Sequence, residues 1–501
     1  MTSYLPGLTI VIPLVGTIVV WAASKVSDTW ADTWAAIVTG AVFAVSLAMY
    51  PTVAAGNTIH MEVVTGFPVE FSLYVDGLGL VLAIVASGLW FLSSLYAVKY
   101  MEHEHHRMRF DVFSLFSLAG MMGIVTTGNM FSFYIFFEMM AILSYLLVIH
   151  EETPEAMRAG LKYLFMGIIG GLTVLVAIVA TYVITGSVDL TRGGLGALQH
   201  SPFFAVIFWS YIFGFAVKAG MFPVHVWLPD AHPVAPSPAS ALLSGVMIKA
   251  GAFGMIRTVY AIFGRGVSNG AALNQTLLVL ALITMILGSA VAITQTEIKR
   301  LLAYSSIAQI GYVILGIAML SAQGLIGSIY HIFGHAMMKG SLFLAAGAII
   351  FMTGLRNIED LRGIGKRMPV TMTAFTLAAF SMIGFPPFIG FLSKWTLAQG
   401  ALDSAHNNIF ALWVAVVIIS ALLLSSLLNV VYYGPIVIRA WFDKGPGEGH
   451  DAESHAKTKH EDPPWQMTLP IVALAAGTLV FGLFPSWIRL LAEQVAGLYF
   501  K

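Results

Sequence analysis

Long apolar runs dominate the chain, and only short polar connections separate them. The apolar windows lie at about 4–24, 33–53, 75–99, 110–128, 129–149, 162–184, 205–224, 234–262, 273–294, 302–320, 325–352, 370–397, 407–440 and 467–492. Each is near or above the ~20 residues that a helix needs to cross a bilayer core. None has the strict alternation of a transmembrane β-strand. The pattern therefore predicts an all-α membrane protein of about fourteen transmembrane helices, with both termini on one side.

Composition supports the membrane prediction and excludes several functions. Of the 501 residues, 58% are hydrophobic and only 10% are charged, whereas a soluble domain is about 25% charged. The zero formal net charge gives no basic field for nucleic acid. Because cysteine is absent, the chain cannot hold a disulfide, a thiolate nucleophile or an iron–sulfur cluster. We expect no cofactor and no redox chemistry within this chain.

Basic residues are distributed unevenly between the two sides. With the N-terminus placed outside, the inner connections hold Lys25, Lys99, Arg107, Arg109, Arg158, Lys162, Lys299, Arg300, Arg356, Arg362, Lys366, Arg367, Arg439, Lys444, Lys457 and Lys459. The outer segments hold only Arg192, Arg257, Arg265, Arg489 and Lys501. By the positive-inside rule, this bias predicts a bacterial or archaeal inner (plasma) membrane protein with both termini on the non-cytoplasmic side.

One long polar segment, residues 441–466, precedes the last apolar window. It is punctuated by glycine and proline, and His450, His455 and His460 recur in it every five residues. We interpret the segment as a solvated cytoplasmic loop. The alternative is a patch that binds a metal or collects protons.

Four lysines and one glutamate lie inside the apolar windows. They are Lys218, Lys249, Lys339, Lys394 and Glu138. A charge at the bilayer centre costs about 2.5–3.5 kcal/mol on insertion scales, so such residues usually face a hydrated path or an ion partner. The alternative is that they only join helices together. Gly245 precedes Lys249 by one turn and would let a neighbouring helix or water approach closely.

Prolines stand beside the lysine in each half of the chain. Pro223 follows Lys218 by five residues, and Pro386 and Pro387 precede Lys394 by about two turns. A proline has no backbone N–H, so it leaves a helical carbonyl without a hydrogen-bond donor. In the second half, the freed carbonyls are those of Met382 and Ile383. Irregular backbone at membrane depth is tolerated where it lines a cavity or is buried in protein. The repeated arrangement is typical of an inverted-repeat transporter, with spans 4–8 and 9–13 as the two units.

His331, His335 and Lys339 are spaced four residues apart and so share one helix face. Histidine exchanges protons near neutral pH, so this face favours a proton relay. Two alternatives remain: hydrogen-bonded core histidines, and a zinc site. The zinc interpretation is weak because the glutamate of H-E-x-x-H is missing.

These segments together resemble a known family. The motifs are FFEMMAILSYLLV, VKAGMFPVHVWLPDAHPVAPSPASALLSGVMIKAGAFGMIR, TEIKRLLAYSSIAQIGY, HIFGHAMMKGSLF and GFPPFIGFLSKW. They are similar to the antiporter-like subunits shared by respiratory complex I, Mrp-type Na+/H+ antiporters and membrane-bound hydrogenases. The resemblance implies two inverted five-helix repeats with broken helices 7 and 12.

The resemblance also implies a role for each buried charged residue. Glu138 and Lys218 would form the interacting charge pair of the first half-channel, with Lys249 as the central lysine. His331, His335 and Lys339 would extend a hydrated axis, and Lys394 would be the terminal proton carrier of the second half-channel. The helix breaks would lie at Pro223, Pro386 and Pro387.

The expected organisation and function follow from this resemblance. The domains would be 1–109 (spans 1–3), 110–262 (first repeat), 263–440 (second repeat), 441–466 (loop) and 467–501 (span 14). The resemblance favours a D-type Mrp antiporter chain that translocates protons in a cation/proton antiporter. The alternative is a proton-pumping chain of a redox-driven complex, such as a complex I-like NADH dehydrogenase, a membrane-bound hydrogenase or a formate-linked complex. The expected partners are other membrane subunits, H+ and Na+, and the lipid bilayer, with no nucleic acid.

Overall fold

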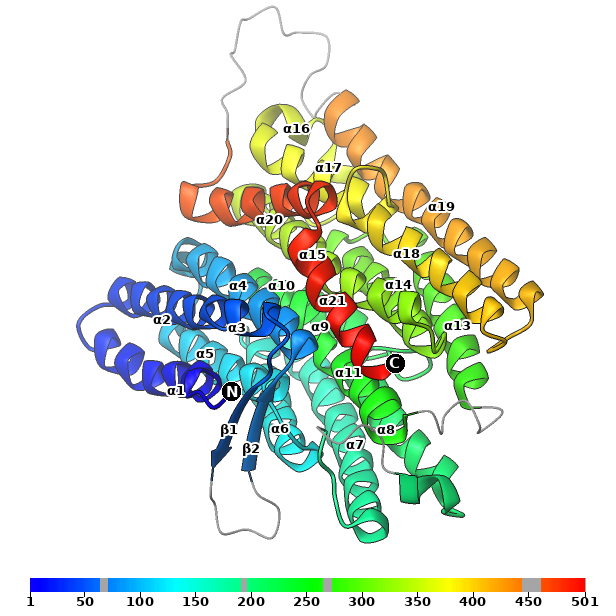
Figure 1. The fold of residues 1–501 in the computed structure, drawn as a ribbon. Helices are drawn as coiled ribbons and strands as arrows, with labels where there is room; N and C mark the ends of the chain where they lie inside the picture. The colour runs from blue at the N-terminus through cyan, green and yellow to red at the C-terminus, as the bar shows by residue number, and fades with distance from the viewer. Residues whose placement is uncertain (64–70, 191–195, 265–272, 444–460, 501) are drawn as a thin grey trace, which may run out of the picture.

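The computed structural model of the chain describes all residues except 64–70, 191–195, 265–272, 444–460 and 501. Most of the described residues are helical (Figure 1), and the sheet among them is one antiparallel pair, β1 (Ile59–Val63) with β2 (Phe71–Val75). The histidines of the polar loop, His450, His455 and His460, lie outside the described residues.

The helices follow the chain in this order. The first half contains α1 (Leu5–Ser24), α2 (Asp28–Ala48), α3 (Tyr50–Ala54), α4 (Gly77–Tyr100), η1 (Met101–His103), α5 (Arg107–Val125), α6 (Met130–Val148), α7 (Pro154–Thr185), η2 (Gly196–His200), α8 (Phe204–Ala219), α9 (Leu228–Val234), α10 (Ser237–Leu242), η3 (Leu243–Met247), α11 (Ile248–Ile256) and η4 (Arg257–Phe263). The second half contains α13 (Leu273–Ile293), α14 (Ile298–Ala318), α15 (Ala322–Thr353), η5 (Ile358–Leu361), α16 (Ile364–Arg367), α17 (Pro369–Ile383), α18 (Ile389–His406), α19 (Leu412–Phe442), α20 (Trp465–Leu483) and α21 (Ser486–Tyr499).

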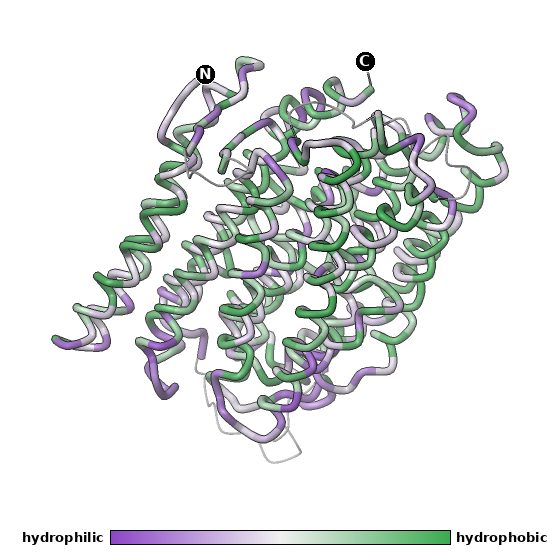
Figure 2. Tube along the Cα trace, turned by 90° about the horizontal axis from the view of Figure 1, so that it is seen from below, coloured by the Kyte–Doolittle hydropathy of each residue, from purple (hydrophilic) through white to green (hydrophobic). Residues whose placement is uncertain are grey.

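Among the described residues, 12 helices are long and apolar enough to cross a membrane, and α8 and α17 are shorter apolar helices. This confirms the predicted all-α, multi-pass class. The count of fourteen spans and the two inverted repeats remain predictions. In Figure 2 apolar residues cover the middle of the helix bundle, polar residues gather toward its ends, and the N- and C-termini lie at the same end.

The helices that carry Lys249 and Lys339, together with α14, form the centre of the bundle. The most apolar window of Ser237–Phe263 is wholly buried, and that of α14 is 94% buried. The 32-residue α15 packs against α14, α18, α17, α20 and α4. The outer helices α7 and α19 instead present exposed apolar side chains such as Val183 and Leu423. Charge on the central helices is therefore shielded from lipid by the surrounding helices.

Glycines end the two interrupted helices, and the prolines follow. α8 is capped by Gly220 at φ +77°, and α17 is capped by Gly384 at φ +95°. This left-handed conformation suits glycine, which has no Cβ to clash. Pro223 lies in the non-helical segment before α9, and Pro386 and Pro387 lie in the one before α18. Both helices therefore end at a glycine, before the chain reaches the prolines.

Two expectations about the ends of elements were wrong. The last apolar window, 467–492, is two elements: α20 ends at Leu483, and α21 is a separate amphipathic helix that packs on α4 and α15. Arg257, which the comparison of basic residues on the two sides assigned to an outer segment, is fully buried in η4. It forms a bidentate ion pair with Asp76 (2.6 and 2.8 Å) and donates to the hydroxyl of Tyr499 (3.1 Å). Asp76 lies 181 residues away in sequence, so a hydropathy pattern cannot reveal this connection.

The buried Asp76–Arg257 pair should support the fold strongly. Asp76→Asn keeps the N-cap of α4 but leaves the Arg257 charge unpaired, which costs about 3–5 kcal/mol when a buried pair is broken. We expect a clear loss of thermal stability in detergent. Glu493→Gln is the control, because the Arg489–Glu493 pair is exposed and such pairs contribute about 0–1 kcal/mol. Equal stability of the two variants would contradict this assignment.

Candidate functional site

Lys218 lies in the last turn of α8 and is held by two hydroxyl groups. Its Nζ donates to the hydroxyl of Tyr163 (2.6 Å) and reaches Ser144 Oγ at 3.5 Å. Tyr163 and Ser144 are hydrogen-bonded to each other at 2.5 Å. Tyr163 also packs on Trp227, whose indole N–H donates to the carbonyl of Val217 (2.7 Å) at the broken end of α8. The helix break and the lysine are therefore tied into one cluster.

Glu138 on α6 shares a small cavity with Lys218. The cavity measures about 20 Å³, which is room for about one water molecule. No direct ion pair joins the two residues among the described side chains, and Glu138 Oε1 has no hydrogen-bond partner there. The structure thus brings the predicted charge pair to one cavity but leaves the carboxylate and the ammonium unjoined.

Gly171 on α7 fixes the position of the Glu138 carboxylate. A Cβ added at Gly171 would lie 1.9 Å from Glu138 Oε1. The neighbouring Gly170 and Gly214 also bring α7 and α8 into close contact, because a Cβ on Gly214 would lie 2.4 Å from the carbonyl of Gly170. Small residues at this crossing therefore admit the carboxylate between the helices.

Lys249 stands beside a π-helical turn. The turn, η3, spans Leu243–Met247, and Lys249 Nζ donates to the carbonyl of Ser244. π-turns inside α-helices are frequent at functional sites. Ser244 Oγ is in turn hydrogen-bonded to Ser306 Oγ on α14 (2.6 Å). The irregular turn supplies an oxygen to a lysine that is 1% exposed.

Lys339 on α15 is anchored to α14. Its Nζ donates to the carbonyl of Leu302 (2.7 Å) and to Ser305 Oγ, and the hydroxyl of Tyr433 lies at 3.4 Å. Ser306, the partner of Ser244, donates to the same Leu302 carbonyl (2.8 Å). Lys339 and the Ser244–Ser306 pair beside Lys249 therefore meet at one carbonyl of α14.

His331 and His335 continue the Lys339 face of α15, as predicted. Their rings stack with centroids 6.0 Å apart, and His331 Nδ1 is hydrogen-bonded to Ser393 Oγ at 2.9 Å. Within the part of the chain that the structure describes, His331 Nε2 and both ring nitrogens of His335 lack a hydrogen-bond partner although they are buried. Buried polar atoms of this kind usually bind internal water.

Lys394 on α18 caps the broken end of α17. Its Nζ donates to the carbonyls of Met382 and Ile383, both at 2.9 Å, and to Ser426 Oγ at 3.0 Å. These are the two carbonyls that the Pro386–Pro387 break is expected to free. A cation at a helix C-terminus also interacts favourably with the helix dipole.

A polar face on α14, which was not predicted from the sequence, contacts Lys339 and Lys394. Ser305, Ser306, Gln309 and Tyr312 follow one another along it. Gln309 is fully buried, and neither atom of its amide has a partner among the described residues. The Tyr312 ring stacks on His331 (5.1 Å) and lies 4.9 Å from Lys394 Nζ. Serine, glutamine and tyrosine are too common in helices for sequence alone to mark this face.

A further buried histidine lies beside the Lys339 cluster. His232 on α9 is fully buried, and both of its ring nitrogens are unpartnered in the described structure. Its ring stacks on Phe343 (4.5 Å), and Lys339 Nζ lies 5.8 Å from that same ring. The motif HVWLPDAH contains this histidine, but its position beside a proline-rich break gives it no role from sequence alone.

Glu138, expected to be buried, is partly exposed, whereas Asp32, Asp76 and Asp111 are buried acids. Asp32 on α2 forms an ion pair with Arg107, and Asp111 on α5 is 4% exposed beside them. Both lie at or near the ends of their apolar windows, where a charge is easily mistaken for a loop residue. α2 and α5 carry none of the residues in the lysine row.

The fold and these residues define a polytopic membrane protein whose helices carry several buried lysines and histidines. Residues 127–422 match the family described as NADH:quinone oxidoreductase/Mrp antiporter, TM, and residues 61–110 match the N-terminal family of complex I chain 5. The chain therefore belongs to the NADH:quinone oxidoreductase/Mrp antiporter family of membrane subunits.

Individual relatives come from both branches of the family. The N subunit of NADH-quinone oxidoreductase from Desulforudis audaxviator (strain MP104C) is 33% identical over 97% of this chain and 96% of its own length. The D-type chain of the Na+/H+ antiporter from Alkalihalophilus pseudofirmus OF4 is 30% identical over 86% of this chain and 83% of its own length. Other relatives are longer, and the chain covers only 56–64% of them.

A solved structure shares the fold. A chain of the Mrp complex from Dietzia sp. DQ12-45-1b superposes with a TM-score of 0.87, with 24% identity over 100% of this chain and 98% of that one.

Gly171→Ala should impair proton transport without harming the fold. The added methyl group must displace the Glu138 carboxylate, which ends a flexible side chain and can move. We expect proton transport to fall several-fold while the melting temperature is unchanged. Gly434→Ala on the outer helix α19 is the control, because the nearest atom to a Cβ there, Val430 Cγ1, lies 3.9 Å away. Equal transport in the two variants would show that the position of Glu138 does not matter.

Proposed function

We propose that the chain is the proton-translocating membrane subunit of a multisubunit cation/proton antiporter of the Mrp type. The observation that carries the proposal is a row of ionisable and polar side chains at the centre of the bundle, some hydrogen-bonded and some with unpartnered buried atoms. Its members are Glu138, Lys218, His232, Lys249, Lys339, Gln309, His335, His331 and Lys394. Intramembrane ionisable groups that face one another in this way usually mark proton paths.

The first half of the path is driven by the charge pair. A carboxylate close to a lysine favours its protonated form, and withdrawal of the carboxylate favours release of the proton. Lys218 is bound to Tyr163 and Ser144 rather than to Glu138. This geometry corresponds to the separated state of the pair. Closure of the cavity between Glu138 and Lys218 would load the lysine, and opening would pass its proton toward His232.

The second half carries the proton from the centre to Lys394. Lys339 binds the carbonyl of Leu302, and Lys249 binds Ser244, whose hydroxyl is hydrogen-bonded to Ser306 on the same helix as Leu302. A proton on one of these neighbouring lysines repels a proton on the other. Gln309 and the two histidines hold unpartnered buried atoms, which water would bridge. Lys394 would receive the proton and release it when the α17–α18 break rearranges.

A redox-driven complex is the second candidate. The observation that favours it is the match to the N subunit of a NADH-quinone oxidoreductase along 97% of this chain. In such a complex this chain would move protons by the same row, and the electron donor would act on another subunit.

Removing a lysine of the row should stop transport. Lys218→Ala and Lys249→Ala are expected to lower proton transport at least tenfold in everted vesicles that contain the native complex, while the complex still assembles. Lys25→Ala, a surface lysine, should leave the rate unchanged. Normal transport in both row variants would disprove the proposed path.

The same vesicles distinguish the two driving forces. A pH gradient that Na+ dissipates without any redox substrate would identify antiport. Proton uptake that requires an electron donor would identify the redox-driven complex. A chain whose charges only join helices would keep its transport unchanged after every charge removal.

We infer that both termini lie on the non-cytoplasmic side of a bacterial or archaeal plasma membrane. The basic residues of the inner connections and the placement of both termini at one end of the bundle support this orientation. Because the chain has no cysteine, a single introduced cysteine is its only thiol, and labelling of the chain reports on that position alone. A cysteine at Thr2 should react with a membrane-impermeant maleimide from outside, and one at Glu102 only after the membrane is opened. The reverse pattern would invert the assigned topology.

A further inference from the structure

A large polar cavity opens at the end of the bundle that we assign to the cytoplasm. It measures about 840 Å³, and its charged lining comes from four separate connections. Glu104 follows η1, Glu151 follows α6, Lys299 lies in the first turn of α14, and Arg356 follows α15. The transport path described above does not use this cavity.

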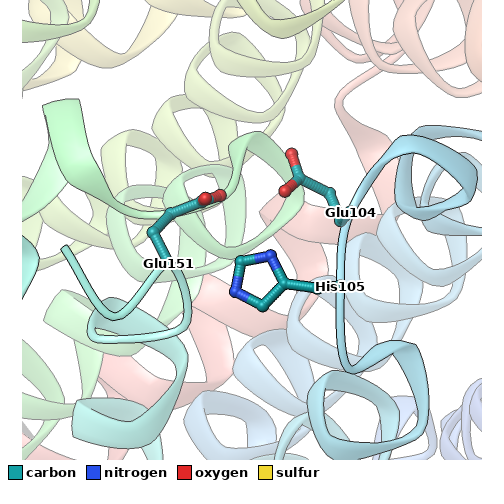
Figure 3. A group of neighbouring side chains, drawn as sticks. All are labelled: Glu104, His105 and Glu151. Carbon is teal, nitrogen blue, oxygen red and sulfur yellow. The ribbon is translucent and has the colours of Figure 1, made fainter.

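Two carboxylates meet at the cavity wall. Figure 3 shows Glu104 and Glu151 reaching toward each other from different segments, with His105 beside them; their oxygen and nitrogen atoms lie within 4.8 Å of one another. Burial, and then the charge of Glu151 and a hydrogen bond to it, raise the pKa of Glu104 to about 7, although Lys299 and Arg356 oppose the shift. Glu104 can therefore take up and release a proton near neutral pH.

Hydrogen bonds connect Lys299 in the cavity to the segment that carries His232. Lys299, which is 4% exposed, donates from Nζ to the carbonyl of Ala235 (2.9 Å). Ser240 Oγ donates to that same carbonyl (3.4 Å) and to the carbonyl of His232 (3.1 Å). Beyond this group lies the imidazole of His232, buried and unpartnered among the described residues. An unsatisfied buried imidazole marks a place where water or a proton is accommodated.

We propose that this cavity is the mouth through which protons from the cytoplasm reach the row, with Glu104 and Glu151 as its proton-loading pair. The proposal rests on the proposed function. Lys299 passes a proton from its ammonium to a ring nitrogen of His232, through water, and so becomes neutral. Glu104 then gives its carboxyl proton to the Lys299 amine, and the resulting carboxylate takes another proton from bulk water. Each step breaks one bond to hydrogen and forms one, so no other reactant is needed.

The alternative is that the carboxylates only stabilise the surface of the bundle. Two acids side by side repel each other when both are ionised, so the arrangement is a poor choice for stability alone. The groups that face Glu104 are Glu151, His105, Lys299 and Arg356. The other titratable residues that line the cavity are Tyr100, His103, Glu155 and Glu297.

Glu104→Gln tests the proposal by its pH profile. Protonation of Glu104 rises as the cytoplasmic pH falls through about 7, so the transport rate of the native complex should rise through an inflection there. In Glu104→Gln we expect this inflection to vanish and the rate at pH 7 to fall at least fivefold. Glu104→Asp retains a carboxylate and should restore a pH-dependent rate. Glu151→Gln should lower the rate similarly and move the inflection.

Glu102→Gln is the matched control. Glu102 lies two residues earlier in the same segment, but its carboxylate is paired with Lys99 and does not line the cavity. Its rate and pH profile should match those of the unmodified chain. All variants are compared in assembled complexes of equal melting temperature, and Glu151→Gln replaces Glu104→Gln if the latter does not assemble.

The outcomes separate this proposal from the proposed function. If Lys218→Ala and Lys249→Ala stop transport while Glu104→Gln and Glu151→Gln keep the normal rate and inflection, the mouth is elsewhere and the row stands. If the lysine variants themselves transport normally, the proposed function fails first. A loss of rate in Glu102→Gln equal to that in Glu104→Gln would also overturn the mouth, because it would show an effect of surface charge alone.

Discussion

The constraint on which this structure depends is that a buried ammonium group needs oxygen atoms within reach. Placing a lysine at membrane depth is costly, and burial without a partner is costlier still. Three lysines donate to backbone carbonyls: Lys249 to that of Ser244, Lys339 to that of Leu302, and Lys394 to those of Met382 and Ile383. Lys218 instead uses the hydroxyls of Tyr163 and Ser144. The irregular backbone of this bundle is therefore placed largely where a charge requires it.

The oxygens that hold the lysines also connect them. Because α14 binds Lys339 through Leu302 and reaches Lys249 through Ser306 and Ser244, a change of charge at one lysine is felt at the next. The groups left unsatisfied, Gln309 and the row histidines, occupy the gaps between the bonded clusters. Water at these unsatisfied atoms would complete the polar connection between the bonded clusters.

Sequence reasoning located the charged members of the row because charge in an apolar window is rare and costly. It also gave the helical class and the family. It could not find hydroxyl and amide members such as Tyr163 or Gln309, because these residues are unremarkable in any helix. Arg257 was misplaced because it lies near the end of its apolar window, where a charged residue resembles part of a loop. Its partner Asp76 is distant in sequence and comes near only in the folded chain. The helix ends at Gly220 and Gly384 were not predicted, because the prolines that follow were taken as the break points.

The central claim is that one hydrated polar row connects the buried lysines, and Gln309 tests it most directly. Gln309→Leu replaces an unpartnered buried amide with an apolar group of similar size, which is neutral or stabilising for a purely structural position. Proton transport by the assembled complex should fall at least tenfold while the melting temperature stays the same or rises. Unchanged transport in Gln309→Leu would contradict the connected row.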